Sequence, residues 1–124
     1  MKPRSPQTLQ TWVEIIPFGA PVPVSTLTTL LAFTDLGSDW ERVAIMLSNE
    51  DATNEVTLIV EVSHGGAHAN DERTQMKSCP ALAERSVLID APNEFTYVGI
   101  AAQTDSPSYP TVNVKFAVLG IHRR

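Results

Sequence analysis

The chain has 124 residues, the length of one domain, and its hydrophobic fraction of 43% and charged fraction of 19% are typical of a soluble globular protein. Its formal net charge of -5 argues against a broad basic face that would bind nucleic acid. The single cysteine, Cys79, excludes an intrachain disulfide and a cysteine-rich zinc site, and it fits a reducing compartment. The longest mostly apolar stretch, Leu27 to Phe33, is too short to cross a membrane, so no membrane partner is expected.

The N-terminal segment from Met1 to Thr8 carries Lys2, Pro3, Arg4 and Pro6 and no acidic residue. No apolar run follows its basic residues, so it is not predicted to be a secretory signal. The two prolines remove backbone donors and favour extended conformations in the residues that precede them. We therefore predict an extended arm over residues 1–8 that docks on a neighbouring subunit, with a frayed terminus as the alternative, followed by a single domain over residues 9–124.

Alternation of apolar and polar residues predicts β-strands along most of the chain. The clearest case is Val56 to Val62, and further strands are expected at 11–18, 24–33, 40–48, 86–90, 95–100 and 112–118. The alternation at 73–79 is weak, so this segment is either an eighth strand or part of a loop from His64 to Pro80 that projects from one end of the domain. A polar hairpin connection is predicted at Asn49 to Asn54, and the only helix candidate is one turn at Pro80 to Glu84.

Seven or eight strands without a helical crossover cannot form a parallel sheet. The sequence therefore predicts an all-β fold, an antiparallel two-sheet sandwich of jelly-roll or immunoglobulin-like type, with a closed barrel as the alternative. Three runs, 30–33, 43–47 and 117–121, are apolar on both faces, which a sandwich strand does not need. Either loops, the N-terminal segment or β-bulges account for the second face, or part of an outer face contacts another subunit.

The densest group of potential metal ligands consists of His64, His68, Asp71 and Glu72. Zinc, manganese or iron would accept such donors. Gly65 and Gly66 exclude the helical spacing of a two-histidine motif, and a flexible loop holds metal ligands poorly. We expect a solvated connection here, and no metal or other cofactor.

Two groups of residues are candidates for a catalytic site. Cys79 could act as a nucleophile with a histidine as base, and Glu61 and Asp90 could form a carboxylate pair, but neither has a supporting signature or spacing. We therefore expect a structural cysteine, separate solvated carboxylates and no enzymatic activity. Sugar binding would require exposed aromatic rings; Trp12 and Trp40 are expected in the core and only Tyr109 is expected to be exposed.

Two parts of the chain resemble small β-sandwich structural proteins of tailed bacteriophages: Trp40 to Asn49 with Glu55 to Val62, and Ile89 to Ile100 with Val112 to Ile121. The resemblance implies a non-enzymatic virion component, assembled in the host cytoplasm. It would be a capsid decoration (cement) or head–tail accessory protein that binds a capsid lattice as a homo-oligomer. The predicted partner contacts are Lys2, Pro3, Arg4, Pro6, Tyr109, His122 and Arg123. The alternative is a carbohydrate- or surface-binding β-sandwich module.

Overall fold

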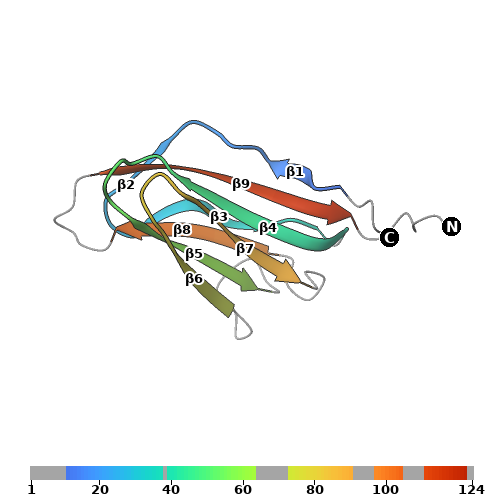
Figure 1. Ribbon diagram of the computed structural model, residues 1–124. Coiled ribbons are helices and arrows are strands. Elements are labelled where there is room, and N and C mark those ends of the chain that lie inside the picture. Colours follow the sequence, from blue (N-terminus) through green and yellow to red (C-terminus); the bar gives the residue numbers. More distant parts are fainter. Residues whose placement is uncertain (1–10, 38, 64–72, 91–96, 105–110, 123–124) are drawn as a thin grey trace, which may run out of the picture.

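A computed structural model describes residues 11–37, 39–63, 73–90, 97–104 and 111–122, and they form two antiparallel sheets stacked face to face (Figure 1). The five-stranded sheet contains β1 (Val13–Ile16), β2 (Val22–Val24), β4 (Trp40–Asn49), β7 (Glu84–Asp90) and β9 (Val112–His122). The four-stranded sheet contains β3 (Thr28–Asp35), β5 (Val56–Ser63), β6 (Arg73–Cys79) and β8 (Tyr97–Thr104). The predicted all-β sandwich is confirmed, with nine strands in place of seven or eight.

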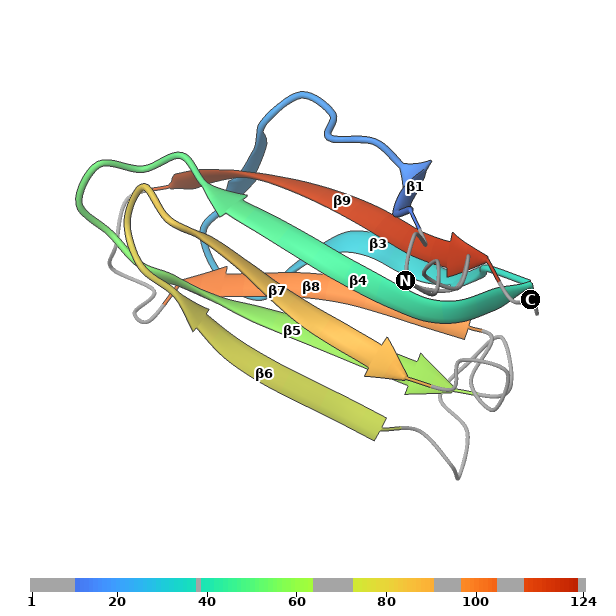
Figure 2. The same cartoon turned by 45° about the vertical axis from the view of Figure 1, so that its right-hand side comes forward.

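The strand pairing is nested and identifies the sandwich as a jelly roll. β1 and β2 both pair with β9, β3 pairs with β8, β4 pairs with β7, and β5 pairs with β6. This is the pattern of one long hairpin folded over on itself, with its strands shared between two sheets (Figure 2). Of the two sandwich types that the sequence left open, the pairing selects the jelly roll.

The additional strand arises where the chain changes sheets. The strand predicted at 24–33 is in fact β2 in one sheet and β3 in the other, with the crossing between Val24 and Thr28. Thr104 at the end of β8 secures the crossing, because its hydroxyl donates to the Ser25 carbonyl at 2.6 Å. Pro23 is tolerated within β2 because this short strand pairs with β9 alone and needs no second set of donors.

Two further expectations about connections were wrong. Asn49 to Asn54 is not a hairpin, because it carries the chain from β4 to β5 in the opposite sheet. The buried Asn49 amide holds this corner by donating to the carbonyls of Asn54 at 2.9 Å and Cys79 at 3.1 Å. The predicted helical turn at Pro80 to Glu84 is instead a non-helical turn between β6 and β7, with Leu82 at a φ of 56°.

β6 forms the predicted eighth strand, so the alternative of a loop reaching Pro80 is wrong over residues 73–79. Its alternation is weak because it lies at the edge of its sheet. Lys77 is paired with Leu58 and so lies on the side of β6 that faces the core. Its ammonium group donates to the Ser86 carbonyl of β7 at 3.0 Å. An edge strand that carries such a charge cannot show the clean apolar pattern of a central strand.

The core lies between the two sheets and is built mainly from valine, isoleucine and leucine side chains of β4, β5, β7, β8 and β9. Register shifts in β3 account for part of one of the three runs that are apolar on both faces, since Leu30 and Leu31 both pack against the core. The other two runs, Val43–Leu47 and Ala117–Ile121, lie side by side in β4 and β9. Their second faces point out of the sandwich.

Candidate interaction surface

The outer side of the five-stranded sheet carries apolar residues that the core does not use. Val43, Ile45 and Leu47 of β4 belong to the core cluster. Since successive side chains of a strand point to opposite faces, Ala44 and Met46 lie on the outer side. Ala44, Ala117 and Ile121 are buried residues outside the core cluster, as this assignment requires.

The register arranges these residues in rows across β7, β4 and β9. Directly opposite residues of antiparallel strands share a face, so each row can be followed from strand to strand. The two middle rows are Leu88–Ala44–Leu119 and Ser86–Met46–Ala117. We call these six residues the apolar face. The outer rows are Asp90–Arg42–Ile121 at one end and Glu84–Ser48–Lys115 at the other.

The residues of the apolar face differ in size and in exposure to solvent. Leu88 is 52% exposed, whereas Ala44 is 4% exposed and Ala117 is fully covered. Other groups on this side of the sheet therefore cover the two alanines. One row is large–small–large and the next is small–large–small. Of the six residues Leu88 alone is largely exposed, and Met46, Leu119 and Ser86 are half-buried.

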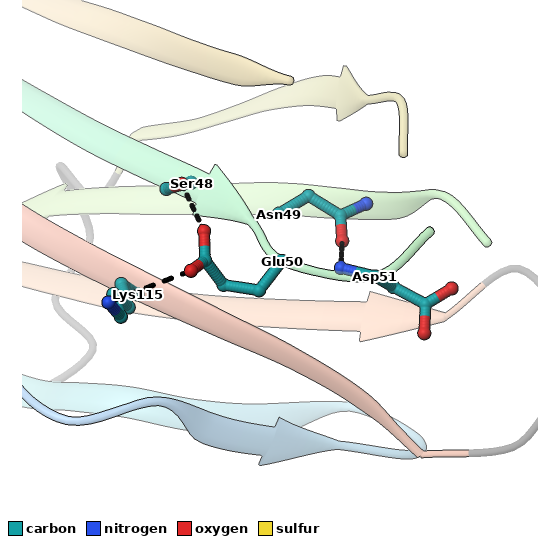
Figure 3. Close-up of polar contacts among 5 residues, drawn as sticks. All are labelled: Ser48, Asn49, Glu50, Asp51 and Lys115. Carbon is teal, nitrogen blue, oxygen red and sulfur yellow. Dashed lines mark hydrogen bonds and ion pairs between the residues drawn. The ribbon is translucent and has the colours of Figure 1, made fainter. Parts of the chain in front are cut away.

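Polar residues close one end of the apolar face. Figure 3 shows the Glu50 carboxylate between Ser48 and Lys115. The Ser48 hydroxyl donates to Glu50 Oε2 at 2.7 Å, and Lys115 Nζ lies 3.6 Å from Glu50 Oε1. These three residues, with Phe18 and Glu84, line a shallow depression of about 260 Å³. Its charged side chains include an internal ion pair, and its volume is below the roughly 300–1,000 Å³ of ordinary small-molecule sites.

Behind this end, the β4–β5 corner is held by a second carboxylate. Asp51 Oδ2 accepts the backbone N–H groups of Thr53 at 3.0 Å and Asn54 at 2.7 Å. These donors favour the charged form and lower the pKa of Asp51, with the Asn54 N–H contributing most. Asn49 Oδ1 accepts the Asp51 N–H at 2.9 Å (Figure 3). These hydrogen bonds fix the backbone of the corner and thereby hold Glu50 beside the apolar face.

A second depression, of about 230 Å³, lies on the outer side of the four-stranded sheet. Gly99 and Ala101 are among its lining residues, together with Phe33, Thr29 and Glu61. The Phe33 ring lies beside Gly99, where a Cβ would stand 3.6 Å from it, at ordinary contact distance. The result is a small concavity with an aromatic wall and polar side chains.

Most of the predicted contact residues fall outside the described part of the chain. Lys2, Pro3, Arg4, Pro6, Tyr109 and Arg123 are in ranges that the structure does not describe. His122 ends β9, where its ring stacks on Trp40 with centroids 4.4 Å apart. The tryptophan also donates from Nε1 to the Leu36 carbonyl at 2.8 Å and packs against the core, as expected for Trp40. The same expectation was wrong for Trp12, which precedes β1 and is 39% exposed.

The other candidate sites either lie outside the described residues or are not assembled there. The histidine-rich segment 64–72 lies outside the described ranges, and among the residues that are described no group of three or more His, Cys, Asp or Glu could hold a metal. Glu61 and Asp90 belong to different sheets. Cys79 is fully buried, its thiol donates to the Ala83 carbonyl at 3.3 Å, and burial raises its pKa. No helix able to span a membrane occurs in the described part of the chain.

Sequence reasoning located the apolar face only in part. The runs at 43–47 and 117–121 flagged two of its strands, whereas Leu88 went unnoticed within an ordinary alternating segment. Glu84 and Phe18 carried no signal at all, because only the register of β7 and the path between β1 and β2 bring them to the same end of the sheet.

Comparisons with known proteins found a distant structural likeness. No family model matches the chain, and no curated protein matches it. Among solved structures the chain is similar to the coat protein of Tobacco streak virus. The two share 13% sequence identity, the match covers 93% of this chain and 88% of that one, and the TM-score is 0.44.

Proposed function

We propose that this chain is a non-enzymatic structural protein of a virus particle, of the capsid decoration or head–tail accessory type, that binds a capsid lattice as an oligomer. The observation that carries the proposal is the apolar face. Leu88, Met46 and Leu119 share a face that points out of the sandwich, although every strand already supplies the core with its other face. Apolar area in excess of what the fold buries is typical of surfaces that meet another protein.

The jelly roll is compatible with this role without specifying it, because the fold is used both by capsid proteins and by lectins. The two outer depressions of about 230 and 260 Å³ are small for substrate sites. In the larger of them Lys115 and Glu50 already pair with each other. The described surface thus offers broad, shallow contact area, which favours assembly over catalysis.

The termini supply further contacts in this proposal. Lys2 and Arg4 give the arm at 1–8 a positive charge, while the whole chain has a net charge of -5. An extended proline-containing arm loses less entropy on docking than a flexible one. Tyr109, His122 and Arg123 are proposed to contribute contacts of the same kind elsewhere on the surface.

The test is to find the chain in particles. An antibody raised against the purified protein should label virus particles that are banded on a density gradient from the chain's source, and mass spectrometry should find it at a fixed ratio to the major capsid protein. Particles assembled without it should lose integrity at a lower temperature. Absence of the chain from intact, purified particles would refute the proposal.

The arm has its own measurement. Deleting residues 1–8 should leave the melting temperature of the purified protein nearly unchanged and should weaken its binding to particles that lack it. If Lys2 and Arg4 contribute, raising the salt concentration should weaken the binding of the intact protein and reduce its advantage over the truncated one. Equal binding by the truncated and intact proteins would show that the arm does not dock.

A carbohydrate-binding role is the second candidate, because the depression on the four-stranded sheet places Phe33 beside Thr29 and Glu61. An aromatic ring with polar neighbours is the arrangement that stacks on a sugar ring. Binding on a glycan array that is lost on Phe33→Ala but kept on Leu88→Glu would favour this role over assembly.

A further inference from the structure

We propose that the end of the sandwich around Leu82 receives the N-terminal arm, residues 1–8, of a second copy of this chain. The inference rests on the proposed function, in which that arm docks on a neighbouring subunit, and it names the surface on which the arm docks. The contact uses one end of the molecule and leaves the apolar face to another partner.

Leu82 is the most exposed of the large apolar side chains in the described residues, at 70%. It lies in the turn that joins β6 of one sheet to β7 of the other, and its φ of 56° is a left-handed conformation that is unfavourable for leucine. Two backbone bonds hold the turn: the Leu82 N–H donates to the Asp51 carbonyl at 3.0 Å, and the Ala83 N–H to the Pro80 carbonyl at 3.2 Å. A strained backbone that presents an apolar side chain to the outside is typical of a binding site.

Carboxylates flank this leucine on both sheets. Glu84 begins β7, and Asp51 lies in the β4–β5 corner beside the turn. Glu55 precedes β5, where it accepts the Ser78 hydroxyl at 3.0 Å. In the described ranges at this end (48–55, 78–85 and 112–115) the charged residues are Glu50, Asp51, Glu55, Glu84, Arg85 and Lys115. Four negative charges against two positive ones leave an excess of two negative charges.

The arm has the complementary charge. Four of the nine basic residues of the chain lie in the segments 1–10 and 123–124, whereas all 14 acidic residues lie between these segments. Within the arm, Lys2 and Arg4 alternate with Met1 and Pro3, so its two positive charges are accompanied by apolar side chains. Such a segment complements an exposed leucine between carboxylates, and charge complementarity fixes its orientation.

The arm of the same chain cannot reach this surface. β1 pairs with the final residues of β9, and the chain that precedes β1 runs on toward the end at which β9 finishes (Figure 1). The acidic corner follows Asn49, which pairs with Val114 near the other end of β9. About eight residues along β9 and three strand spacings across the sheet separate the two places, or roughly 30 Å. Arg4 is seven residues from Thr11 and so lies at most about 25 Å from it. The arm and the surface in contact therefore belong to different copies.

This contact joins two unlike surfaces. Each copy offers one arm and one acceptor end, so copies can link into a ring or a row. Few side chains take part, and we expect a dissociation constant on the order of 0.1 mM at low salt, so that copies link at the high local concentration of a lattice. Raising the salt concentration from about 50 to 300 mM should weaken the association at least fivefold, because the charges that meet are exposed to solvent.

Sedimentation equilibrium of the full chain between about 20 μM and 1 mM at low salt tests the contact. Reversing the charge of the arm (K2E/R4E) or of the acceptor end (E55K/E84K) should weaken self-association at least tenfold. An equimolar mixture of the two variants should associate again, because the negative arm of one variant meets the positive end of the other. A mixture that associates no better than the separate variants, or a wild-type protein that stays monomeric to 1 mM, would overturn the inference.

Two single variants locate the surface. Glu84→Lys and Glu14→Lys make the same change of charge at exposed glutamates on the outer side of the five-stranded sheet, at opposite ends of the sandwich. Only Glu84→Lys should weaken self-association. Equal effects of the two substitutions would refute the placement of the arm at the Leu82 end.

Leu82→Gly separates binding from folding. Glycine adopts a positive φ without strain, so the Tm should rise by about 2–5 °C, while loss of the side chain should weaken self-association at least threefold. A variant that associates as well as wild type would overturn the role of Leu82 in the contact.

Particles separate this inference from the proposed function. If they incorporate the E55K/E84K variant at the wild-type ratio, the chain is a virion protein whose arm docks elsewhere, and the inference fails. Copies that link as described but are absent from particles would refute the virion role and leave the contact intact.

Discussion

The packing of Trp40 against Gly120 makes a sharp prediction for stability. A Cβ atom at Gly120 would lie 2.5 Å from Cε3 of Trp40 and 2.9 Å from Cδ1 of Ile15, whereas ordinary contact begins near 3.4 Å. The indole cannot simply move away. It donates to Leu36 at 2.8 Å and stacks on His122 at 4.4 Å. Gly120→Ala therefore forces a displacement of about 1 Å into a held ring.

The magnitude follows from two opposing effects. Overpacking of a held group costs about 1–3 kcal/mol, and loss of the indole hydrogen bond adds about 1 kcal/mol. Replacement of glycine by alanine returns about 0.5–1 kcal/mol by restricting the unfolded chain. We expect Gly120→Ala to lower the free energy of unfolding by about 1–3 kcal/mol, which corresponds to a fall in Tm of roughly 4–10 °C.

Gly99→Ala is the matched control. Gly99 also lies in a central strand, but a Cβ there would meet the Phe33 ring at 3.6 Å, which is ordinary contact. Its Tm should stay the same or rise by about 1–3 °C. Thermal melts followed by circular dichroism compare the two variants directly. A Gly120→Ala protein that melts at or above the wild-type temperature would refute the proposed packing of Trp40.

Three further predictions concern the corner and the cysteine. Asn49→Ala should lower the free energy of unfolding in urea by about 2–4 kcal/mol, because the carbonyls of Asn54 and Cys79 lose their donor at a buried site; a loss below 0.5 kcal/mol would contradict this role. The pKa of Asp51 is lowered by folding, so its stabilising contribution is present above the ordinary carboxyl value of 3.8 and is lost as the pH falls through the folded value. The difference in stability between wild type and Asp51→Ala should thus shrink below pH 3.8, and a difference that grows in acid would contradict the assigned bonds. Cys79 is buried with a raised thiol pKa, so a disulfide reagent at pH 8 should label the protein only after denaturation, and rapid labelling of the native protein would contradict its burial.

The fold class could be predicted from the sequence because it depends on short-range signals. Strand periodicity in segments such as Val56–Val62 and the lack of a helix long enough for a crossover leave few alternatives to an antiparallel sandwich. The core face of β5 is likewise decided locally, since Val56, Leu58 and Val60 recur at every second position and all three lie in the core. The apolar runs in β4 and β9 indicated in addition that some outer surface is apolar.

The apolar face was decided by tertiary pairing, about which the sequence of a single strand carries no information. Leu88, Ala44 and Leu119 are far apart in the chain, and only the register of β7, β4 and β9 places them in one row. The chain changes sheets after Val24 and again after Asn49. The sequence does not predict these changes, because the polar residues that connect two sheets are of the same kinds as those that form a hairpin turn. Periodicity reports which side of a strand is apolar. Long-range packing determines which strands lie side by side, and hence whether scattered apolar residues form one surface.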